Sequence, residues 1–185
     1  MAATLLDADG RRTLVAGLHH VDVRLVAYVT GGGIAAITDL LTMPGASRTV
    51  LDVRIPYSGA ALADLIEHDG ELAPGVGAVS ETTAAALATA AFRAAAHLAQ
   101  MSDGEKGRLM GVSCTAALTT DRQRRGDDRA HIAICGDHSV TALTVAPDDL
   151  AGATTRQEQD RIVADHLLAA VARGCGVALP LAEER

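Results

Sequence analysis

Apolar and β-branched stretches separated by short polar breaks run along this chain, and their spacing predicts strands and helices in alternation. The clearest case is the strand 24–29, which ends in Thr30, Gly31, Gly32 and Gly33 and leads into apolar residues at helical spacing up to residue 41. The same reasoning predicts a frayed start over 1–11, further strands at 13–18, 49–55, 108–118, 130–134 and 140–145, and further helices at 60–67, 80–100 and 155–173.

This order of elements favours one α/β domain over 1–185. Strands that alternate with helices form parallel pairs, whereas the short connection 135–138 predicts an antiparallel hairpin. We therefore expect a mixed, mostly parallel sheet with helices on both faces, which is a three-layer α/β/α sandwich.

Composition narrows the class of protein. The 185 residues are 49% hydrophobic but only 2% aromatic, so Ala, Val, Leu and Ile must build the core. A net charge of −7 argues against general nucleic-acid binding, which needs a basic surface. No apolar run reaches the length of a membrane span and no charged leader precedes the first apolar residues, so we expect a cytoplasmic protein.

Cysteine and histidine spacing predicts neither a metal site nor a cofactor. The cysteines form no C-x-x-C motif, and we expect three reduced, mostly buried thiols at Cys114, Cys135 and Cys175. The histidines also lack metal-ligand spacing, and we interpret them as polar loop or interface residues: His19, His20, His131 and His138.

Two features predict contact with an anion. The N–H groups of Gly31, Gly32 and Gly33 open a helix and favour negative charge, although a tight β–α turn without a ligand has the same sequence. The loop 121–131 carries arginines that could hold phosphate or carboxylate, namely Arg122, Arg125 and Arg129, together with Arg124. Its interleaved aspartates equally suit a solvated loop of balanced charge.

The ordered motifs resemble the C-terminal domain of the CinA family, the nicotinamide-nucleotide amidohydrolase (NMN deamidase) fold. That family reads Ser-Cys-Thr-Gly-Gly, a helix, Pro-Gly-Ala/Ser-Ser, nine residues, Tyr-Ser-Asn-x-x-Lys, and then Gly-Ala-Val-Ser-Glu. The resemblance covers roughly 24–175, and the matching residues here are Thr30, Gly31, Gly32, Pro44, Gly45, Ala46, Ser47, Tyr57, Ser58, Gly77, Ala78, Val79, Ser80 and Glu81.

The resemblance implies a deamidase in which a Ser nucleophile is activated by a Lys, and this chain departs from it at both positions. Tyr28 stands at the Ser position and Leu62 at the Lys position. A phenol is a weak nucleophile at neutral pH and leucine cannot be a base. The Gly-x-x-Gly-Pro-Gly-Gly loop of the family is also replaced, by residues 114–120.

We therefore carry three hypotheses and favour the first, with the second as its alternative. The first is an enzyme with altered chemistry on a nucleotide or ribosyl-phosphate substrate, and it requires its candidate catalytic groups to converge on one pocket: Tyr28, Tyr57, Cys114 and His131. The second is a non-catalytic nucleotide-binding module. In both, the candidate ligand-binding residues also include Thr30, Ser47, Arg48 and Ser58. The third is a homo-oligomer packed through the alanine-rich helix 80–101.

Overall fold

The sheet at the centre of the molecule is mixed. The structure is a computed structural model that describes residues 5–67, 76–101, 107–121, 126–137 and 139–180. Five strands lie in the order β2-β1-β3-β4-β5, with bounds β1 Val23–Thr30, β2 Val50–Arg54, β3 Arg108–Ala117, β4 Arg129–Cys135 and β5 Val140–Val145. Strand β1 pairs in parallel with β2 and β3, whereas β3–β4 and β4–β5 are antiparallel. The mixed sheet and the hairpin are confirmed, with parallel and antiparallel pairs equal in number among the described strands.

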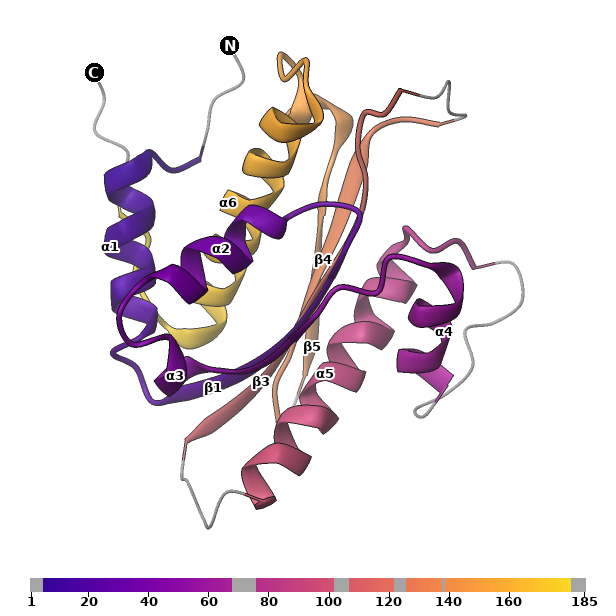
Figure 1. The fold of residues 1–185 in the computed structure, drawn as a ribbon. Helices are drawn as coiled ribbons and strands as arrows, with labels where there is room; N and C mark the ends of the chain where they lie inside the picture. The colour runs from indigo at the N-terminus through magenta and orange to yellow at the C-terminus, as the bar shows by residue number, and fades with distance from the viewer. Residues whose placement is uncertain (1–4, 68–75, 102–106, 122–125, 138, 181–185) are drawn as a thin grey trace.

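Helices cover both faces of the sheet, as predicted (Figure 1). On one face lie α1 (Ala8–Leu18), α2 (Ile34–Thr42) and α6 (Arg156–Cys175), and on the other lie α4 (Gly59–Glu67) and α5 (Glu81–Met101). The short α3 (Ala46–Thr49) leads into β2, and the 3-10 turn η1 (Pro147–Leu150) precedes α6.

The strand predicted at 13–18 is wrong, because these residues belong to α1, and the frayed start predicted over 1–11 is wrong from Ala8 onward, where the same helix begins. The Asp7 side chain accepts a hydrogen bond from the Gly10 N–H and so caps the helix start. Leu14, Val15 and Leu18 then point to one side at helical spacing and are buried. The run Thr-Leu-Val suggested a strand, but burial of this helical stripe decided the structure.

Successive side chains along each strand point to opposite faces of the sheet, and they form a separate hydrophobic core on each face. In β1, Leu25, Ala27 and Val29 face α1, α2 and α6, whereas Val26 and Tyr28 face α4 and α5. Strand β3 alternates in the same way, so its even-numbered residues from 110 to 116 lie on the α6 face. Whether a residue of these strands is odd- or even-numbered therefore decides on which face of the sheet its side chain packs.

Small residues let α5 lie very close to β3. The alanines of α5 that are buried pack onto the sheet of the same chain: Ala84, Ala88, Ala90, Ala91 and Ala95. Gly111 on β3 sits directly beneath α5, because a Cβ added there would lie 2.1 Å from the Ala88 carbonyl oxygen and 2.3 Å from the Phe92 nitrogen. The alanine-rich sequence thus serves contact within the chain, and the oligomeric state stays a prediction.

We expect Gly111→Ala to lower the free energy of unfolding by about 3 kcal/mol, because backbone atoms of α5 cannot yield to the new methyl group. Urea titration measures this change. Gly59→Ala is the matched control, since nothing lies within 4 Å of a Cβ added at Gly59. Equal stability of the two variants would contradict the close approach of α5 to β3.

Candidate functional site

The ends of β1 and β3 meet the start of β4 at one end of the sheet, which we call the C-terminal end of the sheet. The chain leaves β1 to form β2 on one side, while β3 pairs on the other side. Ligands in open α/β sheets bind where connections diverge in this way, beyond the carboxyl ends of the strands. The Thr30 to Gly33 turn lies at this position.

The glycine turn is shaped by close packing within the chain. Gly31 and Gly33 have φ of 79° and 83°, in the left-handed region that favours glycine. A Cβ on Gly31 would lie 1.8 Å from the Ala116 carbonyl oxygen, and one on Gly32 would lie 2.5 Å from the Leu118 side chain. Glycine is therefore required here whether or not a ligand approaches.

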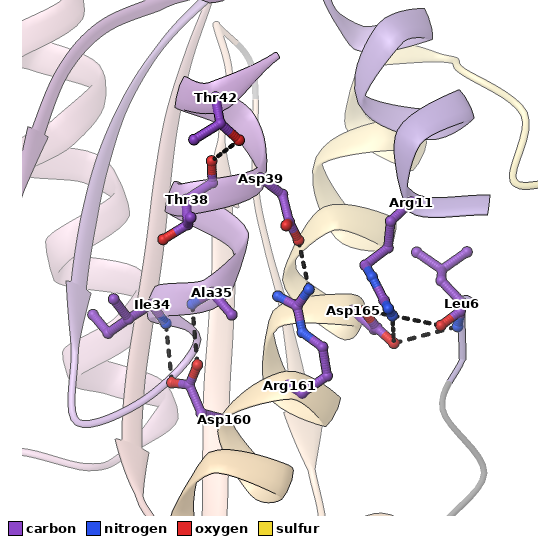
Figure 2. Close-up of polar contacts among 10 residues, drawn as sticks. All are labelled: Leu6, Arg11, Ile34, Ala35, Thr38, Asp39, Thr42, Asp160, Arg161 and Asp165. Carbon is purple, nitrogen blue, oxygen red and sulfur yellow. Dashed lines mark hydrogen bonds and ion pairs between the residues drawn. The ribbon is translucent and has the colours of Figure 1, made fainter. Parts of the chain in front are cut away.

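The start of α2 already holds an anion, the carboxylate of Asp160 on α6 (Figure 2). The N–H groups of Ile34 and Ala35 donate to the two Asp160 carboxylate oxygens at 3.1 and 3.0 Å. A carboxylate at a helix N-terminus is stabilised by the same N–H groups and dipole that would bind a ligand anion. An anion at the turn would have to compete with Asp160 for these donors.

Arg156 joins the segments at the C-terminal end of the sheet. Its Nη2 donates to the Gly31 carbonyl at 2.6 Å and to the Tyr57 hydroxyl at 3.2 Å, and its Nη1 donates to the Thr119 carbonyl at 3.2 Å. Thr30 adds a hydrogen bond from its hydroxyl to the Pro56 carbonyl at 2.7 Å. Thr30, Gly31 and Tyr57 are thus brought together, with Tyr57 69% exposed.

Sequence reasoning missed Arg156 and Asp160. Arg156 is the first residue of α6, and Thr155 is the N-cap of that helix in a capping box with Glu158. The Thr-x-x-Glu spacing signalled where the helix begins. Nothing in the local sequence indicated that its first two turns would reach the turn after β1.

The candidate catalytic residues lie on opposite faces of the sheet. Cys114 is fully buried on the α6 face, and burial first, then the Asp160 charge, raises the pKa of its thiol well above the ordinary range. Tyr28 lies on the α5 face and His131, by alternation on β4, shares that face. The convergence that the enzyme hypothesis required does not include Cys114.

Tyr28 and Leu62, which stand at the positions of the family Ser and Lys, belong to one hydrophobic cluster. Tyr28 is 3% exposed and Leu62 is 6% exposed, and both pack with α5 residues such as Leu87. The Arg54 guanidinium lies 5.8 Å from the centre of the Tyr28 ring. Both side chains therefore contribute to the core packing between the sheet and the helices on the α5 face.

A line of polar residues crosses the α5 face of the sheet, and we call it the polar row. Its members pair across neighbouring strands: Thr30 with Thr115, Thr115 with His131, and His131 with Thr144. The His131 Nδ1 lies 3.0 Å from the Thr144 hydroxyl oxygen. Burial, followed by the charge of Arg129, lowers the pKa of His131, and Glu81 opposes this shift.

Thr115 has the most unusual environment in the polar row. Its side chain is fully buried, yet its hydroxyl has no hydrogen-bond partner among the residues that the structure describes. Ser113, two residues earlier on the same face, donates instead to the Ala84 carbonyl of α5 at 2.6 Å. Thr115 therefore lies toward the start of α5, where Arg129 Nη2 donates to the Val79 carbonyl at 3.4 Å.

Other predicted binding residues lie elsewhere. Arg48 donates from Nε to the His19 carbonyl at 3.2 Å, so Ser47 and Arg48 on α3 lie at the opposite end of β1 from the glycine turn. The Ser58 hydroxyl accepts from the Ala61 N–H as α4 begins. Some residues named from the sequence fall outside the described residues: Arg122, Arg124, Arg125 and His138.

His19 is buried at that opposite end, so its interpretation as a polar loop or interface residue is wrong. It is 1% exposed, and its ring nitrogens contact the Thr49 hydroxyl and the Leu40 carbonyl, each at 2.9 Å. Burial, more than any neighbouring charge, lowers the pKa of His19. The described residues hold no group of three or more His, Cys, Asp or Glu side chains arranged for a metal ion.

Comparison with known proteins agrees with this fold. The model of the CinA C-terminal domain family matches residues 19–132. The chain belongs to the CinA C-terminal domain family. In a separate comparison, curated protein sequences give no significant match.

Solved structures of the CinA superfamily share the fold of this chain at low sequence identity. A competence/damage inducible protein from Agrobacterium tumefaciens is 17% identical, with a TM-score of 0.69, and the match covers 92% of this chain and 98% of that one. A competence-damaged protein (CinA) superfamily protein from Escherichia coli is 14% identical, with a TM-score of 0.68 and coverage of 94% and 95%. At these identities the structural likeness shows the fold alone.

The three cysteines are free, with Cys114 and Cys135 buried and Cys175 partly buried, as predicted. Within the described ranges, no helix has both the length and the apolar character needed to span a membrane.

We expect Asp160→Ala to lower the free energy of unfolding by about 1–2 kcal/mol, since α2 loses a charged cap on two N–H groups. Chemical denaturation measures the loss. Asp64→Ala is the control, because Asp64 is an exposed aspartate on α4, and it should change stability by less than about 0.5 kcal/mol. If both variants unfold at the same denaturant concentration, Asp160 does not support α2.

Proposed function

We propose that this chain is a small-molecule-binding member of the CinA C-terminal domain family that takes a phosphorylated, nucleotide-like ligand without the family's Ser–Lys chemistry. The ligand lies at the C-terminal end of the sheet, between the polar row and the start of α5. The observation that carries this proposal is the buried Thr115 hydroxyl, which lacks a partner among the described residues.

An unpartnered buried hydroxyl costs about 1–3 kcal/mol, and a bound oxygen atom would remove that cost. Arg129 and the start of α5 favour an anionic ligand, whereas the Glu81 carboxylate in the first turn of α5 opposes one. Arg129 lies at the start of the 21-residue helix α5, where it donates to the neutral carbonyls of Asp127 and Val79. The helix dipole adds partial positive charge at the same place.

The environment of Tyr28 and Leu62 supports a binding role rather than catalysis. Leu62 and Tyr28 are packed into the α5-side core, so neither a base nor an accessible nucleophile stands there. Cys114 is closed off on the other face with a raised pKa. These observations support the binding module over the enzyme with altered chemistry.

The enzyme hypothesis retains Tyr57 as an accessible candidate, and the Tyr57 hydroxyl accepts a hydrogen bond from Arg156 at 3.2 Å. The two hypotheses differ in a direct assay. Incubation with nicotinamide mononucleotide should give thermal stabilisation without release of ammonia. Ammonia release that is lost in Tyr57→Phe would instead support an enzyme, and absence of any stabilisation across nucleotides and ribosyl phosphates would count against both.

Thr115→Val tests the binding site through opposite effects on stability and affinity. The variant removes an unpartnered hydroxyl, so the free protein should gain about 1 kcal/mol while ligand affinity falls about tenfold. Calorimetric titration with the ligand found by thermal shift measures the affinity.

Thr49→Val is the matched control, because Thr49 is also buried but its hydroxyl contacts His19 and the Leu18 carbonyl at the other end of β1. It should lose stability and keep full affinity. Unchanged affinity in Thr115→Val would show that the ligand does not reach the polar row.

His131 should make binding depend on pH. Its pKa lies below the ordinary 6.5, so the free protein holds it neutral near pH 7. A bound anion favours the protonated ring, and affinity should therefore rise as pH falls between about 7.5 and about 5.5. His131→Gln reports the background from ionisation of the ligand itself, and an identical pH profile in the variant would exclude His131 from the site.

A further inference from the structure

We propose that two copies of this chain pair through the free edge of β5 and form a two-fold dimer, in which the sheet continues from one copy into the other. Among the described strands, β5 ends the sheet on the side of β4. Its residues are exposed or half-buried except for Val145, which is buried. This inference is independent of the proposed function.

The backbone groups of every second residue of β5 point away from β4. The Gly136 N–H donates to the Ser139 carbonyl at 3.0 Å, so these two residues form a hydrogen-bonded pair across the hairpin. Hydrogen-bonded and non-hydrogen-bonded pairs alternate along an antiparallel ladder, and the next pair in the register is Cys135 with Val140. The residues of β5 whose N–H and C=O groups face outward are therefore Val140, Ala142 and Thr144.

The two edges of the sheet differ in how they are protected against pairing. On the other edge, β2 carries Asp52 and Arg54, which pair with each other at 3.0 Å, and its register with β1 shifts between Leu25 and Val26. Charged side chains and bulges keep an edge strand from adding a partner. The β5 sequence Val-Thr-Ala-Leu-Thr-Val has no charge and no proline, its register with β4 is unbroken, and Val140 is 43% exposed. The β5 edge therefore favours the addition of a further strand.

A second copy of β5 matches this edge residue by residue. A two-fold axis perpendicular to the sheet makes the two β5 strands antiparallel and keeps the α5 faces of both copies on the same side. The pairing that uses all the outward residues then places Ala142 opposite its own counterpart and Val140 opposite the partner's Thr144. Each of these residues donates one backbone hydrogen bond and accepts one across the axis.

The same pairing covers an apolar cavity beside β5 on the α6 face. With Ala142 at the axis, the partner's Leu143 lies opposite Thr141, next to this cavity, and burial of apolar surface favours association. The cavity has a volume of about 360 Å³ and is lined by Ile132, Ile134, Thr141, Ala142, Leu143, Ala170, Arg173 and Gly174.

The charges near the two ends of β5 complement each other across the axis. Arg173 is exposed in the cavity lining beside Thr141, near the start of β5, whereas Asp148 is exposed in η1, just after the end of β5. Neither side chain forms an ion pair within the described ranges. Antiparallel pairing brings the start of each β5 to the end of the other, so Arg173 of one copy approaches the partner's Asp148.

The neighbouring acidic residues do not disturb this match. Asp149 and Arg173 both act on His166 of α6, so η1 and Arg173 lie on the α6 face. Asp137, in the turn before β5, acts on Cys135, which packs on the α5 face. The sheet therefore separates Asp137 from the pair of charges that the dimer brings together.

Analytical ultracentrifugation of the full chain, over about a hundredfold range of concentration, tests for the dimer. We expect a reversible monomer–dimer equilibrium. Ala142→Lys should raise the dissociation constant at least about tenfold, because it places two like charges opposite each other at the axis. Ala142→Thr is the matched control and should still dimerise, since threonine is uncharged and suits a strand. A monomer at every concentration, an assembly larger than a dimer, or an equal effect of the two substitutions would overturn the proposal.

Charge reversal at exposed positions tests the two-fold arrangement without altering the strand. Arg173→Asp and Asp148→Arg should each weaken the dimer, because each variant faces its own copy with like charges. In an equimolar mixture of the two variants, both ion pairs form again with the charges exchanged, so the mixture should associate at least about tenfold more tightly than either variant alone. A mixture that associates no better than its components would contradict pairing through β5.

Discussion

The carboxylate of Asp160 at the start of α2 constrains much of this structure. It satisfies two N–H groups that would otherwise face the turn after β1, and it anchors α6 beside that turn. Arg156, about one helical turn earlier, holds the carbonyls of Gly31 and Thr119. The first turns of α6 therefore assemble the C-terminal end of the sheet while occupying the donors at which an anion was expected.

Because successive side chains of a strand point to opposite faces, the candidate catalytic residues are divided between the two faces of the sheet. Tyr28 lies on the side of α5, whereas Cys114 is directed toward α6 although it pairs with Val29, the neighbour of Tyr28. Groups that are close in the sheet register are therefore separated by the sheet itself. This separation argues against a single catalytic pocket more strongly than the residue types alone do.

The replacement of the family Ser and Lys is coherent as packing. Tyr28 and Leu62 lie in the same hydrophobic cluster, so each makes the other suitable for a buried position. A polar row remains next to this cluster, with the buried Thr115 hydroxyl in it. The molecule thus has polar groups at the C-terminal end of the sheet beside the packed side chains of Tyr28 and Leu62.

The sequence by itself determined the type of most elements, because hydrophobic periodicity and glycine, proline and capping residues act locally. It also indicated the family, through ordered motifs such as Gly77 to Glu81, and the family model matches residues 19–132. The local sequence pattern predicted the wrong element at 13–18, because burying the apolar residues on one side of a helix outweighed the strand preference of those residues. Only the tertiary structure decided that Arg48 lies far from the glycine turn, that Asp160 caps α2, and that Thr115 keeps an unmet donor within the described chain. These facts depend on contacts between residues far apart in the chain, and the packing of helices against the sheet sets such contacts.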